Sequence, residues 1–320
     1  MNAAKTDFND RMLSLGLARV AEQAALASAS LVGRGDEKAA DQAAVNAMRE
    51  QLNLLDIAGV VVIGEGERDE APMLFIGEEV GTGNGPEIDI ALDPLEGTTL
   101  TAKAMANALA VLAIAPRGGL LFAPDTYMDK IAIGPGYEAG IVDLDQSPAD
   151  NIAAMAKAKG VDISAMTACV LDRPRHADII ESLRGVGARV HLISDGDVAG
   201  VINTTNPSTG IDMYVGSGGA PEGVLAAAAL KCVGGQMQGR LVFRNDDERR
   251  RAARTGITDY DKKYDLHELA SGETVFCATG VTKGGLVDGV VRTNGHIETD
   301  TLVMSSADGM VRKIKSWHRA

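Results

Sequence analysis

The chain has 320 residues with 44 acidic and 31 basic side chains, which gives a formal net charge of −13. This excess of acids excludes a general attraction for nucleic acid or for an anionic membrane surface, and an anionic small substrate would need local cationic help. With 45% hydrophobic and 23% charged residues the composition is that of a folded globular protein, and only 3% of the residues are aromatic, which argues against stacking platforms for bases.

The three cysteines, Cys169, Cys232 and Cys277, are far apart and odd in number. They predict neither a disulfide framework nor a thiolate metal cluster. Asp7 and Asp10 interrupt the N-terminal segment, so no signal peptide is expected. No apolar run reaches the roughly 18–20 residues of a membrane span. We therefore expect a cytoplasmic protein.

The first half of the chain predicts two helices followed by strands. Helical spacing predicts an amphipathic helix from about Asp7 to Leu31, with Leu15 and Val20 on its apolar face. Asp36 is the expected N-cap of a second helix, which ends near residue 55. Strands are expected at 60–63, 75–76, 88–92 (ended by Pro94) and 108–115, and a further helix near residue 98.

The second half predicts a layered α/β arrangement. The turn-rich, acidic segment 143–150 is the expected boundary between two tightly packed lobes: residues 1–147 with a metal and phosphate site, and residues 148–320 with sugar-binding loops. Beyond it, strands at 167–171, 188–193 and 211–215 alternate with helices at 176–183, 198–202 and 223–232. We interpret the charged segment 246–254 as a solvated helix.

Asp41 is the first carboxylate in an unexpected place. It shares a helix face with Val45, Met48 and Leu52, which form a buried stripe. An ionised carboxylate in such a place needs a cation or several hydrogen-bond donors. A structural salt bridge and a metal site both satisfy that need.

A second group of acids follows the strand at 60–63. Glu65, Glu67, Asp69 and Glu70 lie within six residues on a glycine-containing loop. Loops at the carboxyl ends of strands are where α/β sheets place ligand sites. A solvated loop and a divalent-cation site are the two interpretations.

The strongest signal is the segment from Asp93 to Thr98, with the sequence Asp-Pro-Leu-Glu-Gly-Thr. The carboxylates of Asp93 and Glu96 can converge on one hard cation around the proline bend. Gly97 lets the backbone approach a ligand, and Thr98 opens a helix whose free N–H groups favour phosphate. An ordinary strand–turn–helix with a capping threonine is the alternative.

Three further loops follow predicted strands. The glycine-rich segment 216–223 carries Glu222 at a helix start, where the acid either binds a ligand or favours the helix dipole. Arg173 and Arg175 offer guanidinium groups suited to phosphate, and the segment 195–197 offers carboxylates for sugar hydroxyls. Each loop alone is more often merely polar, but all of them lie at strand ends.

These motifs resemble a known family. Asp93–Thr98, with Gly64–Glu67 upstream, resembles the metal-dependent, lithium-sensitive phosphatases that include inositol monophosphatases. The segments 33–36, 44–48, 63–73, 174–176, 195–197 and 218–223 more narrowly resemble class II fructose-1,6-bisphosphatases of bacteria. The similarity runs from about residue 8 to beyond 312. It departs at Glu37, where relatives often have Lys.

The resemblance implies a layered α-β-α-β-α sandwich of the sugar/inositol phosphatase type and a set of site residues. Asp41 and Glu65 would hold one Mg²⁺ or Mn²⁺, and Asp93, Glu96 and Glu222 a second. The Glu96-Gly97-Thr98 turn would hold the scissile phosphate, with Thr98, Asp41 and Glu65 as the catalytic residues. The residues implied for the sugar and its distal phosphate are Tyr127, Arg173, Pro174, Arg175, Asp195, Gly196, Asp197 and Gly219.

The implied activity is hydrolysis of the 1-phosphate of fructose 1,6-bisphosphate in gluconeogenesis, by metal-assisted in-line attack of water, in a homo-oligomer (dimer or tetramer). Sedoheptulose 1,7-bisphosphate is the alternative or second substrate. A non-catalytic metal- or phosphosugar-sensing protein is the alternative of another class. A Rossmann oxidoreductase would need a glycine fingerprint that the sequence lacks.

Overall fold

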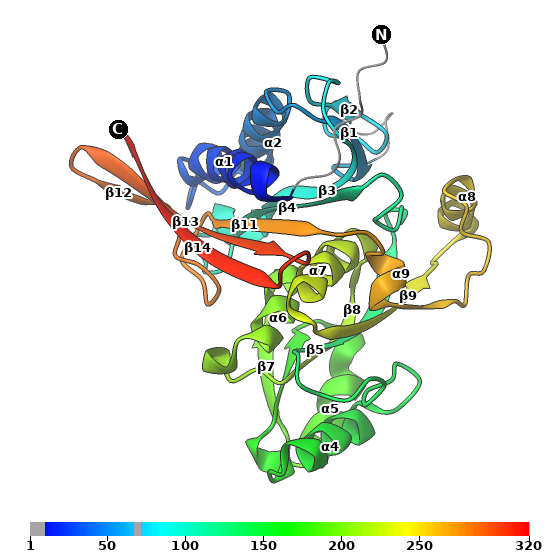
Figure 1. Cartoon of the computed structure of the whole chain (residues 1–320). Coiled ribbons are helices and arrows are strands. Elements are labelled where there is room, and N and C mark those ends of the chain that lie inside the picture. Colours follow the sequence, from blue (N-terminus) through cyan, green and yellow to red (C-terminus); the bar gives the residue numbers. More distant parts are fainter. Residues whose placement is uncertain (1–9, 67–71, 320) are drawn as a thin grey trace. The chain divides into compact units, whose positions relative to one another are not determined.

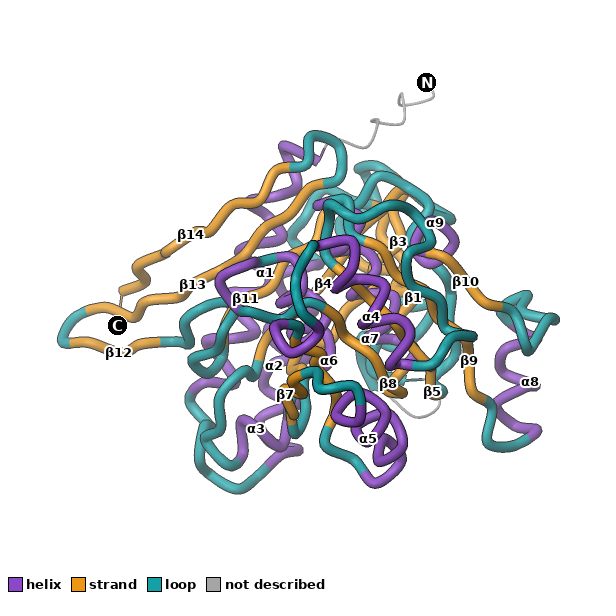
Figure 2. Tube along the Cα trace, turned by 90° about the horizontal axis from the view of Figure 1, so that it is seen from below, coloured by secondary structure: helices purple, strands orange, loops and turns teal. Residues whose placement is uncertain are grey.

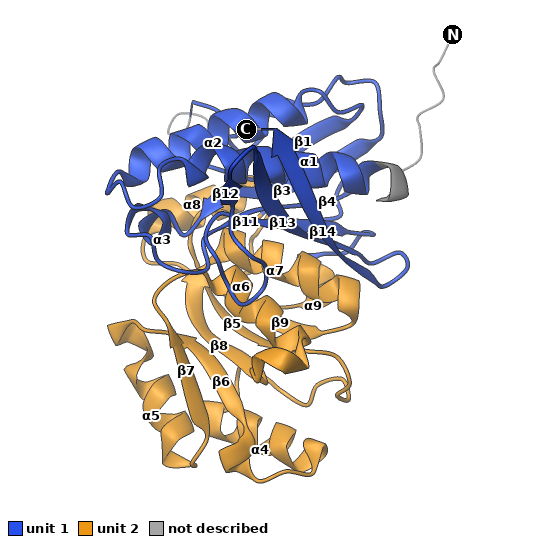
Figure 3. Ribbon diagram, turned by 90° about the vertical axis from the view of Figure 1, so that its left-hand side faces the viewer, with its two compact units in different colours: residues 1–122, 270–320 blue, residues 123–269 orange. Residues whose placement is uncertain are grey.

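The computed structural model describes residues 10–66 and 72–319. The chain forms two compact units: unit 1 comprises residues 1–122 and 270–320, and unit 2 comprises residues 123–269 (Figure 3). The segment 143–150, expected as a boundary, lies inside unit 2. The reason is that β5 (Tyr127–Ile133), which precedes it, pairs with β8 (Met213–Gly219) and β9 (Gln236–Val242), which follow it.

Unit 1 is built on one mixed sheet. In the described residues the sheet has eight strands in the order β12-β13-β11-β4-β3-β1-β2, with β14 paired to β13 (Figure 1). β1 and β3 are parallel, and β4 runs antiparallel to β3. The strands are β1 (Ala58–Ile63), β2 (Glu79–Val80), β3 (Glu87–Glu96), β4 (Leu109–Pro116), β11 (Val275–Gly280), β12 (Val291–Thr293), β13 (His296–Ser305) and β14 (Met310–Arg319). β13 and β14 lie side by side as a long two-stranded ribbon (Figure 2).

Helices α1 (Asp10–Ala29) and α2 (Glu37–Leu52) pack on this sheet and share its hydrophobic core. Both were predicted, and the Asp36 carboxylate caps α2 by accepting the Ala39 N–H at 3.0 Å. Val20 is buried as expected, but Leu15 is 69% exposed, so the predicted apolar face was wrong at Leu15. Leu17 and the small alanines of α1 form the packed face instead, because they allow a close approach to the sheet.

Two strand predictions in unit 1 were wrong. Phe75–Ile76 lies in a turn region, and the short strand β2 comes later, at Glu79–Val80. β3 does not end at Pro94 but continues to Glu96, with a register shift against β4 between Asp93 and Glu96. A bulge tolerates proline because the missing N–H costs no ladder hydrogen bond there.

Unit 2 contains a second mixed sheet, in the order β10-β9-β5-β8-β6-β7 among the described residues. The predicted βαβα alternation is confirmed, since β6 is parallel to both β7 and β8. The remaining strands are β6 (Thr167–Leu171), β7 (Arg189–Ile193) and β10 (Lys263–Asp265). The helices are α4 (Pro148–Lys159), α5 (Ala177–Gly185), α6 (Asp197–Ile202), α7 (Ala220–Val233), α8 (Asp246–Arg254) and α9 (Leu266–Leu269), with 3₁₀ turns η1 (Ile163–Ala165), η2 (Pro174–His176), η3 (Asn203–Thr205) and η4 (Pro207–Thr209).

Helices cover both faces of the unit 2 sheet. Ile131 and Ile133 of β5 share a core with Met155 of α4 and Leu183 of α5. The alternate β5 residue Met128 faces α7, where a Cβ on Gly223 would lie 2.6 Å from the methionine sulfur. Unit 2 is therefore an α/β/α sandwich, and the predicted α/β class is confirmed for the chain. The stacking of five layers stays a prediction.

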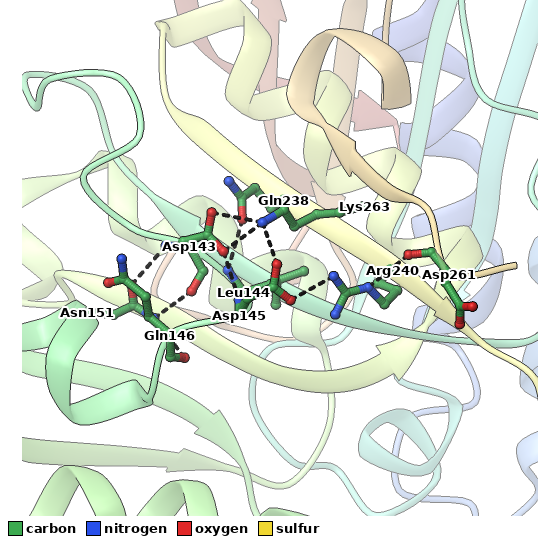
Figure 4. Close-up of polar contacts among 9 residues, drawn as sticks. All are labelled: Asp143, Leu144, Asp145, Gln146, Asn151, Gln238, Arg240, Asp261 and Lys263. Carbon is green, nitrogen blue, oxygen red and sulfur yellow. Dashed lines mark hydrogen bonds and ion pairs between the residues drawn. The ribbon is translucent and has the colours of Figure 1, made fainter. Parts of the chain in front are cut away.

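The segment expected as a boundary is tied to this sheet by a polar network (Figure 4). Lys263 of β10 donates to Asp143 at 2.7 and 2.8 Å and to Asp145 at 2.7 Å, and Arg240 of β9 donates to Asp145 at 2.7 Å. The backbone N–H of Leu144 donates to a side chain of β9 at 2.9 Å. The acidic bias of this loop thus matches basic partners on the sheet.

No helix in the described residues has the length and apolar character needed to cross a bilayer.

Candidate active site

Three carboxylates gather where two parallel strands of unit 1 end. Glu65 follows β1, and Asp93 and Glu96 close β3, its parallel neighbour. Carboxylate oxygens of Asp93 and Glu96 lie within 4.8 Å of each other, and Glu96 is only 5% exposed. The register shift at the end of β3 brings these two side chains together, although they are three residues apart in the chain.

The backbone around Gly64 fixes the position of Glu65. The Glu65 N–H donates to the carbonyl oxygen of Leu74 at 3.0 Å. A Cβ on Gly64 would lie 2.1 Å from that same oxygen, so only glycine permits this close approach. The neighbouring acids Glu67, Asp69 and Glu70 lie outside the described residues, within 67–71.

Asp41 reaches the same cluster from α2. The loop before α2 is attached to α3 (Thr98–Ala102), because the Gly33 N–H donates to Thr101 O at 2.9 Å and the Gly35 N–H to Ala102 O at 3.1 Å. Asp41 is half-buried, on the edge of the buried α2 face predicted from sequence.

The electrostatics of this cluster fit a bound cation. Burial, together with the charges of Asp93 and Asp41, raises the pKa of Glu65 to about 9. Burial also raises the pKa of Asp41. In the described part of the chain, no cationic neighbour is among the causes that act on either pKa. Crowded, buried carboxylate oxygens with this spacing suit a hard divalent ion such as Mg²⁺ or Mn²⁺.

The Glu96-Gly97-Thr98 turn leads directly from the carboxylates into α3. Gly97 is the N-cap of α3 and has a left-handed backbone with φ 89°, while no side chain caps the helix start. Its carbonyl accepts hydrogen bonds from the Thr101 N–H at 3.0 Å and the Thr101 hydroxyl at 3.2 Å. Thr98 is half-buried beside the carboxylates that precede it in the chain.

In unit 2, the structure brings Tyr127 and Arg175 together. The guanidinium carbon of Arg175 lies 4.9 Å from the centroid of the Tyr127 ring. The Arg175 side chain donates to the Ser217 carbonyl at 3.0 and 2.8 Å, so it is oriented by the glycine-rich loop. Arg173 and Asp195 form a half-exposed ion pair at 3.9 Å across the ends of β6 and β7. The predicted arginine and aspartate loops are therefore neighbours.

Asp197 forms an ion pair with a buried lysine to which no sequence motif pointed. Lys130, in the middle of β5 and 1% exposed, forms a buried ion pair with Asp197 and donates to the Gly219 carbonyl at 2.8 Å. The Tyr214 hydroxyl donates to Asp197 at 3.3 Å. Lys130 thus joins the 195–197 segment to the glycine-rich loop.

His176 links two further segments of unit 2 by hydrogen bonds. Its ring bonds to the Leu171 carbonyl through Nδ1 at 2.8 Å, and Nε2 accepts the Ser217 N–H at 2.8 Å. Since Nε2 accepts, this network assigns a neutral ring with its proton on Nδ1. The sequence indicated only a helix-start residue here, and nothing in its spacing pointed to this bridge.

Gly219 is required by the start of α7. A Cβ on Gly219 would lie 1.8 Å from Oε2 of Glu222, so the glutamate folds back against its own helix cap. Glu222 belongs to unit 2, whereas the other predicted metal ligands belong to unit 1. Its role as a ligand stays a prediction.

Carboxylates clustered at the strand ends of an α/β sheet, followed by a Gly–Thr turn into a helix, define the class of metal-dependent phosphate-ester hydrolases. Comparison with known proteins narrows this class. The model of the family described as bacterial fructose-1,6-bisphosphatase, glpX-encoded, matches residues 11–318. The chain belongs to this family.

Named relatives agree with the family match. The chain is 46% identical over 334 aligned positions to the D-fructose 1,6-bisphosphatase class 2/sedoheptulose 1,7-bisphosphatase of Synechococcus sp. (strain JA-3-3Ab), covering 97% of this chain and 96% of the relative. It is 45% identical over 321 positions to fructose-1,6-bisphosphatase 1 class 2 of Escherichia coli (strain K12), covering 96% and 95%. The resemblance inferred from the motifs is confirmed.

Proposed function

We propose that this protein hydrolyses the 1-phosphate of fructose 1,6-bisphosphate, yielding fructose 6-phosphate and inorganic phosphate in gluconeogenesis. The observation that carries the proposal is the cluster of half-buried carboxylates, Asp41, Glu65 and Asp93, next to the Gly97–Thr98 turn, in a member of this family. A divalent cation beside these oxygens would favour their ionised form, and the same cation would offset the charge of a phosphate ester.

Asp41 and Glu65 hold one divalent ion in this proposal, and Asp93, Glu96 and Glu222 hold a second. When bound, Mg²⁺ or Mn²⁺ offsets phosphate charge, lowers the pKa of water and stabilises the leaving alkoxide. Oxygen ligands alone do not decide between the two metals.

The chain's own groups orient the reactants. The Thr98 hydroxyl, with Asp41 as its acceptor, directs the attacking water in line with the leaving oxygen. The Glu96-Gly97-Thr98 turn would hold the scissile phosphate. The loops of unit 2 hold the sugar and its distal phosphate through Tyr127, Arg173, Pro174, Arg175, Asp195, Gly196, Asp197 and Gly219.

Sedoheptulose 1,7-bisphosphate is a second candidate substrate, because the Synechococcus relative carries both activities in its name. A sensing protein on the same scaffold is disfavoured, since a binder has no need for the hydroxyl of Thr98 beside a complete set of carboxylates.

The test is phosphate release from a panel of sugar bisphosphates and monophosphates, with Mg²⁺ or Mn²⁺ and with a chelator. We expect chelator-sensitive release from fructose 1,6-bisphosphate. Thr98→Ala and Asp41→Ala should each abolish turnover and leave the circular dichroism spectrum unchanged. Near-normal phosphate release by Asp41→Ala would refute the assignment.

We also propose a cytoplasmic homo-oligomer, a dimer or tetramer, as the resemblance implies. Light scattering coupled to gel filtration measures the mass in solution. A single species at the monomer mass over the micromolar range would contradict this part of the proposal.

A further inference from the structure

A second arginine lies over the Tyr127 ring. The guanidinium carbon of Arg244 is 4.8 Å from the ring centroid, and that of Arg175 is 4.9 Å from it. Arg244 comes from the segment between β9 and α8, far from the arginine loop in sequence. No sequence motif assigned a role to Arg244.

A buried glutamate holds Arg244 in this position. Glu248 of α8 is 1% exposed and accepts both the Arg244 Nε–H and the Arg244 backbone N–H at 2.7 Å. Thr126, the residue before Tyr127, places its hydroxyl 3.0 Å from the same carboxylate. One carboxylate therefore fixes the arginine relative to the ring, and it needs no ligand to do so.

The start of α8 keeps Glu248 in place. Asn245 caps the helix by accepting the Glu248 N–H at 2.9 Å. The charged segment 246–254 does form the predicted helix, but it is not solvated throughout, because Glu248 and Ala252 are buried. The hydrogen bonds to Arg244 and to the Thr126 hydroxyl account for the burial of this acid in a largely exposed helix.

Two guanidinium groups on one ring favour an anion. Because both distances are measured to the same centroid, the two like charges lie within about 10 Å, a Debye length in 0.1 M salt. Arg244 is paired with Glu248, whereas the Arg175 side chain donates to a neutral carbonyl in the part of the chain that the structure describes. Arg244 is also 55% exposed despite its ion pair, which leaves donors available.

We propose that Arg244 is a further binding residue for the distal phosphate of the sugar bisphosphate, with Glu248 as its positioning residue. This inference rests on the proposed function, since it assigns one group to the same substrate. Arg175 and Arg244, which come from different loops and both lie against the Tyr127 ring, bind the same phosphate in this proposal. The ring fixes the spacing of the two guanidiniums through cation–π contacts.

The test is calorimetric binding of fructose 6-phosphate, which carries only the distal phosphate, to the full-length protein. Arg244→Gln should raise the dissociation constant about tenfold, the loss of one charge-assisted hydrogen bond, and Arg244→Lys should restore part of the affinity. Arg250→Gln is the matched control, because Arg250 lies on the exposed face of α8 and pairs only with Asp247 among the described residues. It should bind as the wild type does.

Rates of phosphate release distinguish a loss of substrate binding from a general structural effect of the substitution. For fructose 1,6-bisphosphate, Arg244→Gln should raise KM about tenfold with kcat within about threefold, and its kcat/KM for fructose 1-phosphate should be unchanged. Wild-type affinity of Arg244→Gln for fructose 6-phosphate, or an equal loss with both substrates, would overturn the inference. If no substrate is hydrolysed but fructose 6-phosphate binding still depends on Arg244, the proposed function fails and the inference stands.

Discussion

In unit 2, one buried ion pair joins two loops of the predicted site. Lys130 and Asp197 are both more than nine-tenths buried and form one ion pair, joined by the Gly219 carbonyl and the Tyr214 hydroxyl. Two buried charges of this kind stabilise a structure only as a pair, because either one alone lacks its solvation. The 195–197 segment and the glycine-rich loop therefore depend on one lysine in a neighbouring strand.

We expect Lys130→Met to destabilise the protein by about 3–5 kcal/mol, because it leaves the Asp197 carboxylate buried without a cation. Urea denaturation followed by circular dichroism measures the loss. The double variant Lys130→Met/Asp197→Asn removes both charges and should lose less than about half as much. If the double variant loses as much as the sum of the two single variants, the two charges do not act as a pair.

The connection between β5 and α4 is attached to the sheet through Lys263 (Figure 4). The hydrogen bond from Lys263 is the main cause that holds the pKa of Asp143 below its ordinary value. A carboxyl whose folded-state pKa is depressed stabilises the protein above its unfolded-state pKa and loses that contribution as pH falls through the folded-state value. This stabilisation is therefore present at neutral pH and lost in acid.

Lys263→Gln should lower the free energy of unfolding by about 1 kcal/mol or less at pH 7, since the pair is partly exposed. At pH 3 the difference from the wild type should shrink. Urea midpoints at the two pH values test this, with Lys157→Gln on the exposed side of α4 as the matched control. A difference that is equally large at pH 3 would assign the effect to packing of the lysine stem.

Three strands with continuous apolar or β-branched runs, β1, β4 and β6, were predicted from sequence, whereas the fully buried β11 was not. β9 and β13 were not predicted, because Gln236–Val242 and His296–Ser305 mix polar residues into their pattern and owe their strand form to pairing with distant segments. The acids at the strand ends and the arginine loop of the site were likewise predictable, because short sequence segments were enough to point to them. Lys130 was missed because its contacts with Asp197 and Gly219 join residues far apart in the chain, and Arg244 was missed because its contact with Tyr127 does so too.

Part of the net charge of −13 is concentrated in unit 1, where partly buried carboxylates lie together. A ligand that binds only the folded protein stabilises it by mass action, about 2.7 kcal/mol at one hundred times its dissociation constant. Divalent ions should therefore stabilise the whole molecule as well as support turnover.

We expect Mg²⁺ to raise the melting temperature and a chelator to reverse the rise, measured by calorimetry without substrate. Asp41→Asn should abolish most of the shift. Glu50→Gln, on the exposed face of the same helix, should leave it intact. A full Mg²⁺ shift in Asp41→Asn would place the ion elsewhere.

Unit 2 is inserted into unit 1, and the two chain crossings lie together: Leu120 and Ala270 form a bridge, and the Ser271 N–H donates to Gly119 O at 2.8 Å. In the sheet of unit 1, β11 lies between β4 and β13. A ribosome makes β4, whose residues are nearly all buried and apolar, long before it makes β11. The nascent chain thus carries an open apolar edge throughout the synthesis of unit 2, the condition under which unpaired strands aggregate or recruit chaperones. That edge is closed only when β11, which follows unit 2 in the chain, has been made and pairs with β4.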